Sequence, residues 1–225
     1  MKIAIIGFGG MGNNHRKYII PRLNDSDYPE KLDIAGIYDI SEERKEFAAQ
    51  LGLHNFNSAE EIFADESIKI VLIATPNDLH KPYVLEALSC GKNVIVEKPM
   101  GLDTEEVNEM YAAAKKYGKV FEVHQNRRWD DDFLTVKNMY DKKLLGETYL
   151  IESRVMGSNG IPGAWRKNPE QGGGMMLDWG VHLIDQMLLM IADKVKSVEC
   201  DYSYQAGEKV DDGFDLLVKF KGGMR

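Results

Sequence analysis

The sequence predicts an α/β protein whose first half is a doubly wound parallel sheet and whose second half is an α+β domain. In the first half, short runs rich in Val and Ile alternate with helical segments. These runs show little alternation of polar and apolar residues, as expected for strands that helices cover on both faces. The predicted strands are residues 2–6, 33–38, 70–74, 93–97 and 120–124.

Helix signals fall between these strands. Ser41 can cap a helix with two acidic residues in its first turn, and the segments SAEE (58–61) and DTEE (103–106) fit capping boxes. Glycines lie where the predicted helices should stop, at Gly52, Gly91 and Gly118.

After residue 124 the pattern changes to that of a second, α+β domain. We expect a helix near 132–143, a strand near 148–156, a Gly/Pro-rich loop over 157–174, a helix near 177–191 and strands near 197–204 and 213–220. The last strand runs into KGGMR (221–225), which resembles a hairpin turn, so the sheet of this domain is expected to be truncated. We place the two domains at residues 1–124 and 125–225.

Composition argues against several classes of function. The chain has 225 residues, 44% of them hydrophobic, which is enough to bury a core. Lys and Arg number 28 against 36 Asp and Glu, and a net charge of -8 leaves no basic stripe for nucleic acid. No apolar run approaches the roughly 20 residues of a membrane span, and the sequence starts with a strand-like run, so we expect neither a membrane span nor a secretory signal. The two cysteines lack metal-ligand spacing and suit a reducing, cytoplasmic setting.

A glycine-rich motif follows the first strand. The six residues match GxGxxG at the mouth of a helix, the context in which this pattern predicts a dinucleotide site. They are Gly7, Phe8, Gly9, Gly10, Met11 and Gly12. Gly7 permits the tight turn, Gly9 lets pyrophosphate approach the backbone, and Gly12 lets helix and strand pack closely. The helix N-terminus would attract the anion, although such turns also occur without a nucleotide.

Asp39 ends the second strand, 27 positions after Gly12. The usual spacing is roughly 20, and residues 21–30 have the composition of an inserted loop. A carboxylate there can accept both ribose hydroxyls of NAD and would repel the additional phosphate of NADP. Ile40 beside it offers no cation, whereas Arg44 is a weak counter-argument. We therefore expect NAD rather than NADP; the alternative is that Asp39 is only a cap or turn residue.

Further motifs follow in order along the chain. They are ATPNDLH (74–80), GKNVIVEKP (91–99), NRR (126–128), WR (165–166), GGG (172–174) and LDWGVH (177–182). Together with the glycine motif, they resemble the Gfo/Idh/MocA family of nicotinamide-dependent oxidoreductases. Members of that family continue well past the point where this sequence ends.

The resemblance implies an N-terminal Rossmann domain, a C-terminal domain on an open, largely antiparallel sheet, and a substrate site between them. Sugars, polyols and related ring compounds are the substrates it implies. For the full-length protein it also implies a dimer or tetramer formed through that sheet.

Hydride transfer from a carbinol needs a group that manages the hydroxyl proton and a group that steadies the developing alkoxide. Lys98 suits the second role because it follows a strand at the edge where open α/β sheets bind ligands. The resemblance implies that this lysine assists catalysis and touches the substrate. The alternative is a surface lysine with no role.

Asp178 and His182 are four residues apart, so they project from one face of the predicted helix. An apolar stripe predicts that this helix is mostly buried; the stripe consists of Leu177, Val181, Ile184, Leu188 and Ile191. By resemblance, His182 is the general acid/base, Asp178 orients it or relays its proton, and both contact the substrate. A hydrogen-bonded structural pair is the alternative.

Other residues have secondary predicted roles. The cofactor is expected to contact Ile40, Thr75, Pro76, Asn77, His80, Glu97, Lys98, Gln125, Trp165 and Arg166, and the substrate is expected to contact Asn126 and Arg127. His80 could simply start a helix, Arg127 and Arg128 could form salt bridges, and Trp165 could be an ordinary packed side chain. The five histidines show no ligand cluster in the sequence, and neither His15 nor His54 has a neighbour suggesting metal, so we expect no metal.

These observations predict an NAD-dependent dehydrogenase or reductase that acts on a CH–OH group of a sugar, polyol or related ring compound. Two alternatives stay open. One is a catalytically silent, nucleotide-binding regulatory module, and the other is a truncated, inactive fragment of such an enzyme.

Overall fold

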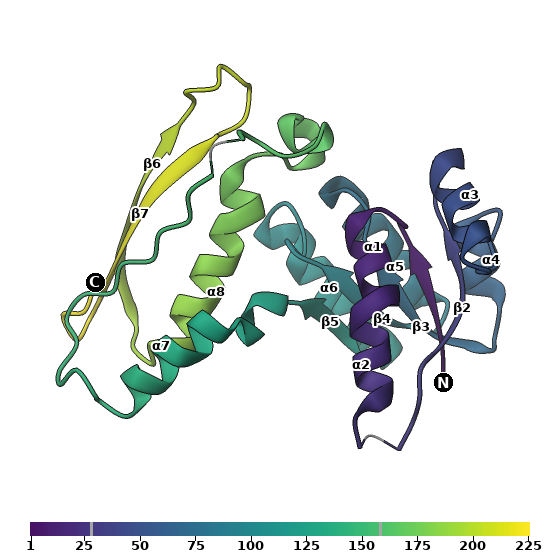
Figure 1. The fold of residues 1–225 in the computed structure, drawn as a ribbon, viewed down its shortest axis with the longest axis horizontal. Coiled ribbons are helices and arrows are strands. Elements are labelled where there is room, and N and C mark those ends of the chain that lie inside the picture. Colours follow the sequence, from purple (N-terminus) through teal and green to yellow (C-terminus); the bar gives the residue numbers. More distant parts are fainter. Residues whose placement is uncertain (28, 158) are drawn as a thin grey trace. The chain divides into compact units, whose positions relative to one another are not determined.

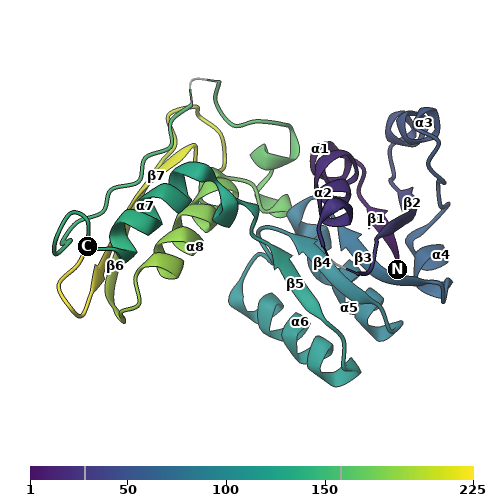
Figure 2. The ribbon, with the colours of Figure 1, turned by 60° about the horizontal axis from the view of Figure 1, so that its bottom comes forward.

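The computed structural model describes residues 1–27, 29–157 and 159–225, in two compact units, Met1–His124 and Gln125–Arg225 (Figures 1 and 2). Tyr28, in the loop predicted over 21–30, and Ser158, in the loop predicted over 157–174, lie outside the described residues. Within the described part of the chain, no helix is long and apolar enough to cross a membrane.

The first unit is built on a five-stranded parallel sheet in the order β2-β1-β3-β4-β5. Its strands are β1 (Lys2–Ile6), β2 (Asp33–Tyr38), β3 (Ile68–Ile73), β4 (Asn93–Glu97) and β5 (Phe121–His124). The predicted doubly wound sheet is therefore confirmed, with strand bounds shifted by at most two residues. Because β2 and β3 lie on opposite sides of β1, the chain reverses its winding direction there, and such a switch point is where open α/β sheets bind ligands.

Helices cover both faces of this sheet. One face packs against α2 (Ile20–Asp25) and α3 (Glu42–Gln50), and the other packs against α4 (Ala59–Ala64), α5 (His80–Ser89) and α6 (Thr104–Tyr117). Alternate residues of β1 serve the two cores: Ile3 and Ile5 face the first, whereas Ala4 and Ile6 face the second. The short, apolar strands of the sequence thus have both faces buried.

The helix after β1 is continuous but changes its winding. It comprises α1 (Gly10–Asn14), a π-helical segment η1 (His15–Ile19) and α2. The loop predicted over 21–30 is therefore wrong in its first half, because residues 21–25 are helical. Pro21 lies at the second residue of α2, directly after the π-helical segment.

Two of the predicted N-caps are confirmed. The side chain of Ser58 accepts a hydrogen bond from the backbone N–H of Glu61, and Asp103 accepts one from Glu106. Ser41 precedes α3, but its side chain makes no capping bond, so that prediction is wrong in detail. Positive-φ glycines follow α3, α5 and α6 as predicted, at Gly52, Gly91 and Gly118.

The second unit combines two longer helices with an antiparallel hairpin. It contains η3 (Asn126–Trp129), α7 (Asp131–Asp141), η4 (Trp165–Lys167), η5 (Pro169–Gln171), the π-helical η6 (Met176–Gly180), α8 (Val181–Met190), β6 (Val195–Ser203) and β7 (Gly213–Phe220). Its core joins Phe133 of α7 to Met190 at the end of α8 and to Val218 and Phe220 of β7.

Two expectations for this unit are corrected. Residues 148–156 are extended but form no strand, because their backbone pairs only with Arg225 among the described residues: Arg225 N donates to Tyr149 O, and Ile151 N donates to Arg225 O. The helix predicted to be mostly buried leaves Leu188 and Leu189 exposed, by 53% and 44%. Within the described residues, α7 and β7 cover only part of its surface.

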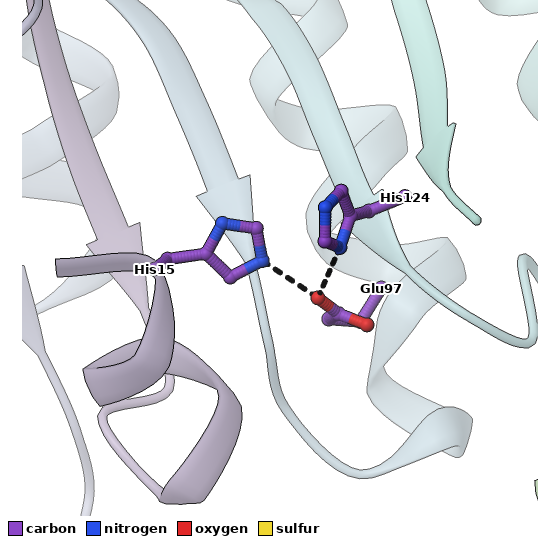
Figure 3. Close-up of side chains that lie close together, drawn as sticks. All are labelled: His15, Glu97 and His124. Carbon is purple, nitrogen blue, oxygen red and sulfur yellow. Dashed lines mark hydrogen bonds and ion pairs between the residues drawn. The ribbon is translucent and has the colours of Figure 1, made fainter. Parts of the chain in front are cut away.

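A polar cluster is buried where β4 and β5 end (Figure 3). Nε2 of His15 lies 2.6 Å from Oε1 of Glu97, and Nδ1 of His124 lies 3.0 Å from the same oxygen. Burial alone would raise the pKa of the Glu97 carboxyl, but the hydrogen bonds from His124 and His15 outweigh it and lower that pKa to about 2. The cluster ties the helix after β1 to two strands of the sheet.

The first prediction concerns the packing of that helix. A Cβ added at Gly12 would overlap the carbonyl of Gly7, whereas one added at Gly10 would meet no atom within 4 Å. Gly12→Ala should lower the free energy of unfolding by about 1–3 kcal/mol, as overpacking does. Gly10→Ala, the matched control, should not lower it. Urea denaturation followed by circular dichroism measures both, and equal loss in the two variants would contradict the contact.

The second prediction concerns acid stability. Because the folded-state pKa of Glu97 is depressed to about 2 from 4.5, its contribution is fully present above pH 4.5 and is lost as the pH falls toward 2. By linkage this contribution is roughly 3 kcal/mol. Glu97→Gln should therefore be less stable at pH 7, and the difference from the unmodified protein should shrink between pH 4.5 and 2.

Glu122→Gln provides the control for this measurement, since Glu122 lies exposed on the neighbouring strand β5. Its stability curve should follow that of the unmodified protein across the whole range. A constant difference between the Glu97→Gln variant and the unmodified protein at every pH would show that the carboxylate charge does not stabilise the fold.

Candidate functional site

The glycine loop lies at the switch point between β1 and β3. Gly7 has a φ of +89°, and a Cβ there would lie 2.6 Å from the carbonyl oxygen of Ala74, just after β3. Phe8 is fully buried and anchors the loop in the core, whereas Met11 is half-buried. Positions Gly9 and Gly10 face open space, because an added Cβ would meet nothing within 4 Å at either. The loop is thus packed against the sheet at Gly7 and Phe8, whereas Gly9 and Gly10 face open space at the start of a helix.

Asp39 lies next to this loop. Its Oδ2 accepts a hydrogen bond of 2.6 Å from the backbone N–H of Phe8, and its Oδ1 accepts one of 2.9 Å from Ser41. It is therefore a turn residue, as the alternative interpretation held, and it also touches the glycine loop. Each carboxylate oxygen can accept more than one hydrogen bond, so acceptor capacity remains for ribose hydroxyls. Ile40 beside it is 78% exposed.

His80 connects two loops at the same edge of the sheet. It begins α5, as the alternative for it stated, and it is also fully buried. Its Nδ1 lies 2.8 Å from the carbonyl oxygen of Pro99, and its Nε2 lies 3.2 Å from that of Thr75. Burial lowers the pKa of His80, while the carbonyl oxygens of Pro99 and Thr75 act in the opposite direction. His80 therefore links the Thr75-Pro76-Asn77 loop after β3 to the loop that carries Lys98.

Lys98 is half-buried and directly follows β4. It lies between Glu97, whose carboxylate is turned into the buried cluster, and Pro99, to which it is joined by a cis peptide bond. The ends of β1, β2, β3 and β4 all contribute predicted site residues, because parallel strands present their carboxyl ends at one edge.

The expectation that the histidines form no cluster is wrong. His15, Glu97 and His124 offer ligand atoms that all lie within 4.8 Å of one another (Figure 3). Such a set could hold a divalent cation, but its N···O distances of 2.6 and 3.0 Å are those of hydrogen bonds. His15 and Glu97 are 82 residues apart, so the sequence gives no local sign of their contact. The pairing of β4 with β5 places Glu97 opposite His124, and it was the one signal for this group.

In the second unit, Asp178 lies in the π-helical η6 and His182 in the first turn of α8. Oδ1 of Asp178 forms an ion pair of 3.1 Å with Nε of Arg166. His182 is buried, and its ring meets that of Trp179 edge-on at a centroid distance of 6.0 Å. The structure thus brings the loop that carries Arg166 to the start of the predicted catalytic helix, in a π-helical turn of the kind often found at functional sites.

Stacked cations and indoles surround this helix start. The guanidinium of Arg166 lies 4.3 Å from the ring centroid of Trp165, and that of Arg127 lies 4.1 Å from Trp179. Both distances are within the range in which a guanidinium is attracted to the face of an indole ring. Trp179 was missed in the sequence, although its position inside the LDWGVH motif, between Asp178 and His182, was a signal.

The salt-bridge alternative holds for both arginines after Asn126, which begins η3. Arg127 pairs with Asp130 at 2.8 Å. Arg128 donates two hydrogen bonds, of 2.8 and 2.6 Å, to the carboxylate of Asp185 on α8. The pair of Arg128 with Asp185 attaches η3 to α8. Gln125, just before η3, has a buried Oε1 with no hydrogen-bond partner among the described residues.

Asp211 is a second residue that sequence reasoning missed. Its backbone oxygen accepts from Met175 N at 3.0 Å, and its Oδ2 accepts from Met176 N at 2.8 Å. These bonds satisfy free N–H groups at the start of η6 and so position the turn that carries Asp178. The predicted catalytic residues are divided between the units, with Lys98 in the first and Asp178 and His182 in the second.

Comparison with known proteins agrees with this arrangement. Residues 1–125 match a family model described as "Oxidoreductase family, NAD-binding Rossmann fold", and residues 133–225 match the GFO/IDH/MocA C-terminal domain. A crystal structure of an NAD-binding protein from Listeria innocua is similar with a TM-score of 0.93 and 45% identity, over 99% of this chain and 64% of that one.

Two curated relatives are also similar. The scyllo-inositol 2-dehydrogenase (NADP(+)) IolW of Bacillus subtilis is 30% identical over 84% of this chain and 51% of its own length. The uncharacterized oxidoreductase YdgJ of Escherichia coli is 33% identical over 71% of this chain and 46% of its own. The chain thus spans about half the length of these relatives. With its parallel sheet, its glycine loop and both halves matched, the chain belongs to the Gfo/Idh/MocA family of oxidoreductases.

Proposed function

We propose that the protein is an NAD-dependent oxidoreductase that acts on a hydroxyl or carbonyl carbon of a sugar, polyol or related ring compound. The observation that carries the proposal is the glycine loop at the switch point of the sheet, hydrogen-bonded to Asp39 through Phe8 N. A helix N-terminus, open space above two glycines and a carboxylate beside them are what a dinucleotide requires.

In this proposal Gly9 and Gly10 would hold the pyrophosphate, because an added Cβ at either position meets no atom within 4 Å. The free N–H groups at the start of the helix bind its oxygens. Asp39 accepts hydrogen bonds from the adenosine ribose, and its negative charge disfavours a phosphate on that ribose. Bound NAD supplies the hydride acceptor.

Residues of both units would then act on the substrate. With the cofactor as hydride acceptor, His182 would take the proton of the substrate hydroxyl as the carbinol carbon is oxidised to a carbonyl. The Lys98 ammonium stabilises the negative charge that develops on the oxygen. Asp178, held by Arg166, orients His182. The reverse sequence reduces the carbonyl.

The substrate class rests on resemblance and on the names of relatives, among which are an inositol dehydrogenase and a D-glucoside 3-dehydrogenase. Polyhydroxylated rings offer many hydrogen-bonding groups, which suits a site furnished with charged and aromatic side chains. The self-association expected from the resemblance stays a prediction.

The third prediction concerns the choice of cofactor. NADH should bind at least about tenfold more tightly than NADPH, because a phosphate near the Asp39 carboxylate is repelled at low effective dielectric. Asp39→Ser should narrow this ratio. Asp33→Ser, which changes an exposed carboxylate at the opposite end of β2, should leave the ratio unchanged. Fluorescence titration of the reduced cofactors measures all three proteins, and equal affinities in the unmodified protein would contradict the NAD preference.

The fourth prediction tests the reaction itself. The protein should reduce NAD with at least one compound of a panel of sugars, inositols and other polyols, monitored by absorbance of NADH. Lys98→Ala should lower kcat about 100- to 1000-fold through loss of charge stabilisation at the substrate oxygen. Lys116→Ala, in the last turn of α6, is the matched control and should retain full activity.

Binding of NADH without turnover on any member of the panel would contradict the enzymatic proposal and favour the nucleotide-binding regulatory module. Absence of NADH binding would contradict the cofactor site as well. Turnover that persists in the Lys98→Ala variant would remove Lys98 from the mechanism while leaving the enzyme in place.

A further inference from the structure

The buried cluster of His15, Glu97 and His124 has no part in the mechanism proposed above. Both histidines direct a ring nitrogen at Oε1 of Glu97, at 2.6 and 3.0 Å. Glu97 and His15 have side chains only 5% exposed, whereas the side chain of His124 is 23% exposed. His124 is therefore the member of the cluster that a ligand can reach.

The carboxylate determines where the protons lie. Glu97 remains ionised, and an ionised carboxylate accepts hydrogen bonds but donates none. Nε2 of His15 and Nδ1 of His124 must therefore each carry a proton. The two ring centroids lie 4.5 Å apart, so two positive rings beside one carboxylate would repel each other.

The proton on Nδ1 determines the hydrogen-bonding role of the second ring nitrogen of His124, Nε2. In the neutral ring, a proton on Nδ1 leaves Nε2 with a free lone pair, which makes it a hydrogen-bond acceptor. Within the part of the chain that the structure describes, Nε2 of His124 has no hydrogen-bond partner. Figure 3 shows this edge of the ring turned away from Glu97.

The position of His124 suggests which ligand group it meets. His124 ends β5, on the far side of the sheet from β2 and Asp39. Its ring touches that of His15, which lies five residues, or about 7.5 Å, along the helix from Gly10. A dinucleotide with its adenosine ribose on Asp39 and its pyrophosphate over Gly10 therefore directs its nicotinamide half toward β4 and β5.

We propose that Nε2 of His124 accepts a hydrogen bond from the carboxamide NH₂ of the nicotinamide ring, and that Glu97 positions His124 for it. The inference rests on the proposed function, because it assumes a bound nicotinamide cofactor. The phosphates and the carboxamide oxygen only accept hydrogen bonds, so the carboxamide NH₂ is the donor that the nicotinamide ring itself offers to an acceptor.

The fifth prediction compares NADH with the reduced 3-acetylpyridine analogue, whose acetyl group keeps a carbonyl but has no N–H. The unmodified protein should bind NADH roughly three- to tenfold more tightly than the analogue, as one hydrogen bond allows. His124→Asn retains an amide N–H at the position of Nδ1, for Glu97, but has nothing at Nε2. In this variant the two affinities should fall within about twofold of each other, by the logic of a double-mutant cycle.

Two further variants and one further ligand complete the test. His124→Gln places an amide oxygen near the position of Nε2, so it should retain the preference for NADH, and loss of the preference in this variant would contradict the inference. His54→Asn is the matched control, because His54 is exposed and its ring contacts Phe56 rather than the cluster. ADP-ribose, which lacks the nicotinamide ring, should bind the unmodified protein and every variant equally.

Several outcomes would overturn the inference. An unchanged preference in His124→Asn would show that Nε2 does not meet the carboxamide, and equal weakening of NADH, the analogue and ADP-ribose would show a purely structural role. Stoichiometric zinc bound to this cluster would also overturn it, because a metal on Nδ1 of His124 leaves the ring proton on Nε2, which would then donate rather than accept. If neither NADH nor ADP-ribose binds the unmodified protein, the proposed function fails together with the inference.

Discussion

The close contact between the glycine loop and the helix that follows it supports the rest of the first unit's site. Gly12 lies against the carbonyl of Gly7, and Gly7 lies against that of Ala74, so β1, β3 and the first helix meet with no side chain between them. This close packing leaves open space at Gly9, at the N-terminus of the helix. It also brings His15, one turn later, within hydrogen-bond distance of Glu97 on β4. One steric condition therefore governs both the candidate cofactor loop and the buried cluster.

Buried polar side chains then connect the loops at the two edges of the sheet. At the carboxyl edge, His80 joins the loops after β3 and β4, and Glu97 joins the ends of β4 and β5 to the first helix. At the opposite edge, Lys92 donates to the carbonyl oxygens of Asp65 and Ile68, and burial lowers its pKa. Hydrogen bonds compensate the cost of burying these groups. In the first unit, the candidate site residues lie at the carboxyl edge, where the loops carry functional side chains.

The second unit organises its candidate residues in another way. They lie at the start of a helix rather than at a sheet edge. The π-helical turn η6 is positioned there by hydrogen bonds to Asp211 and by the ion pair of Arg166 with Asp178. The cation–π contact of Arg127 with Trp179 and the double hydrogen bond of Arg128 to Asp185 attach η3 to the same helix. The arrangement of the candidate residues in this unit thus depends on charged side chains from three separate segments.

The sequence by itself determined the features that depend on local order along the chain. The strands, the helix stops at glycine, the GxGxxG turn and the position of Asp39 all follow from neighbouring residues, since turn geometry and strand burial leave local signals. The tertiary structure alone decided the pairings of residues distant in sequence, such as His15 with Glu97 and Arg166 with Asp178. It also decided that residues 148–156 form no strand. A hydrogen bond or a strand needs a partner, and where the partner is remote, folding and not local composition determines whether it is there.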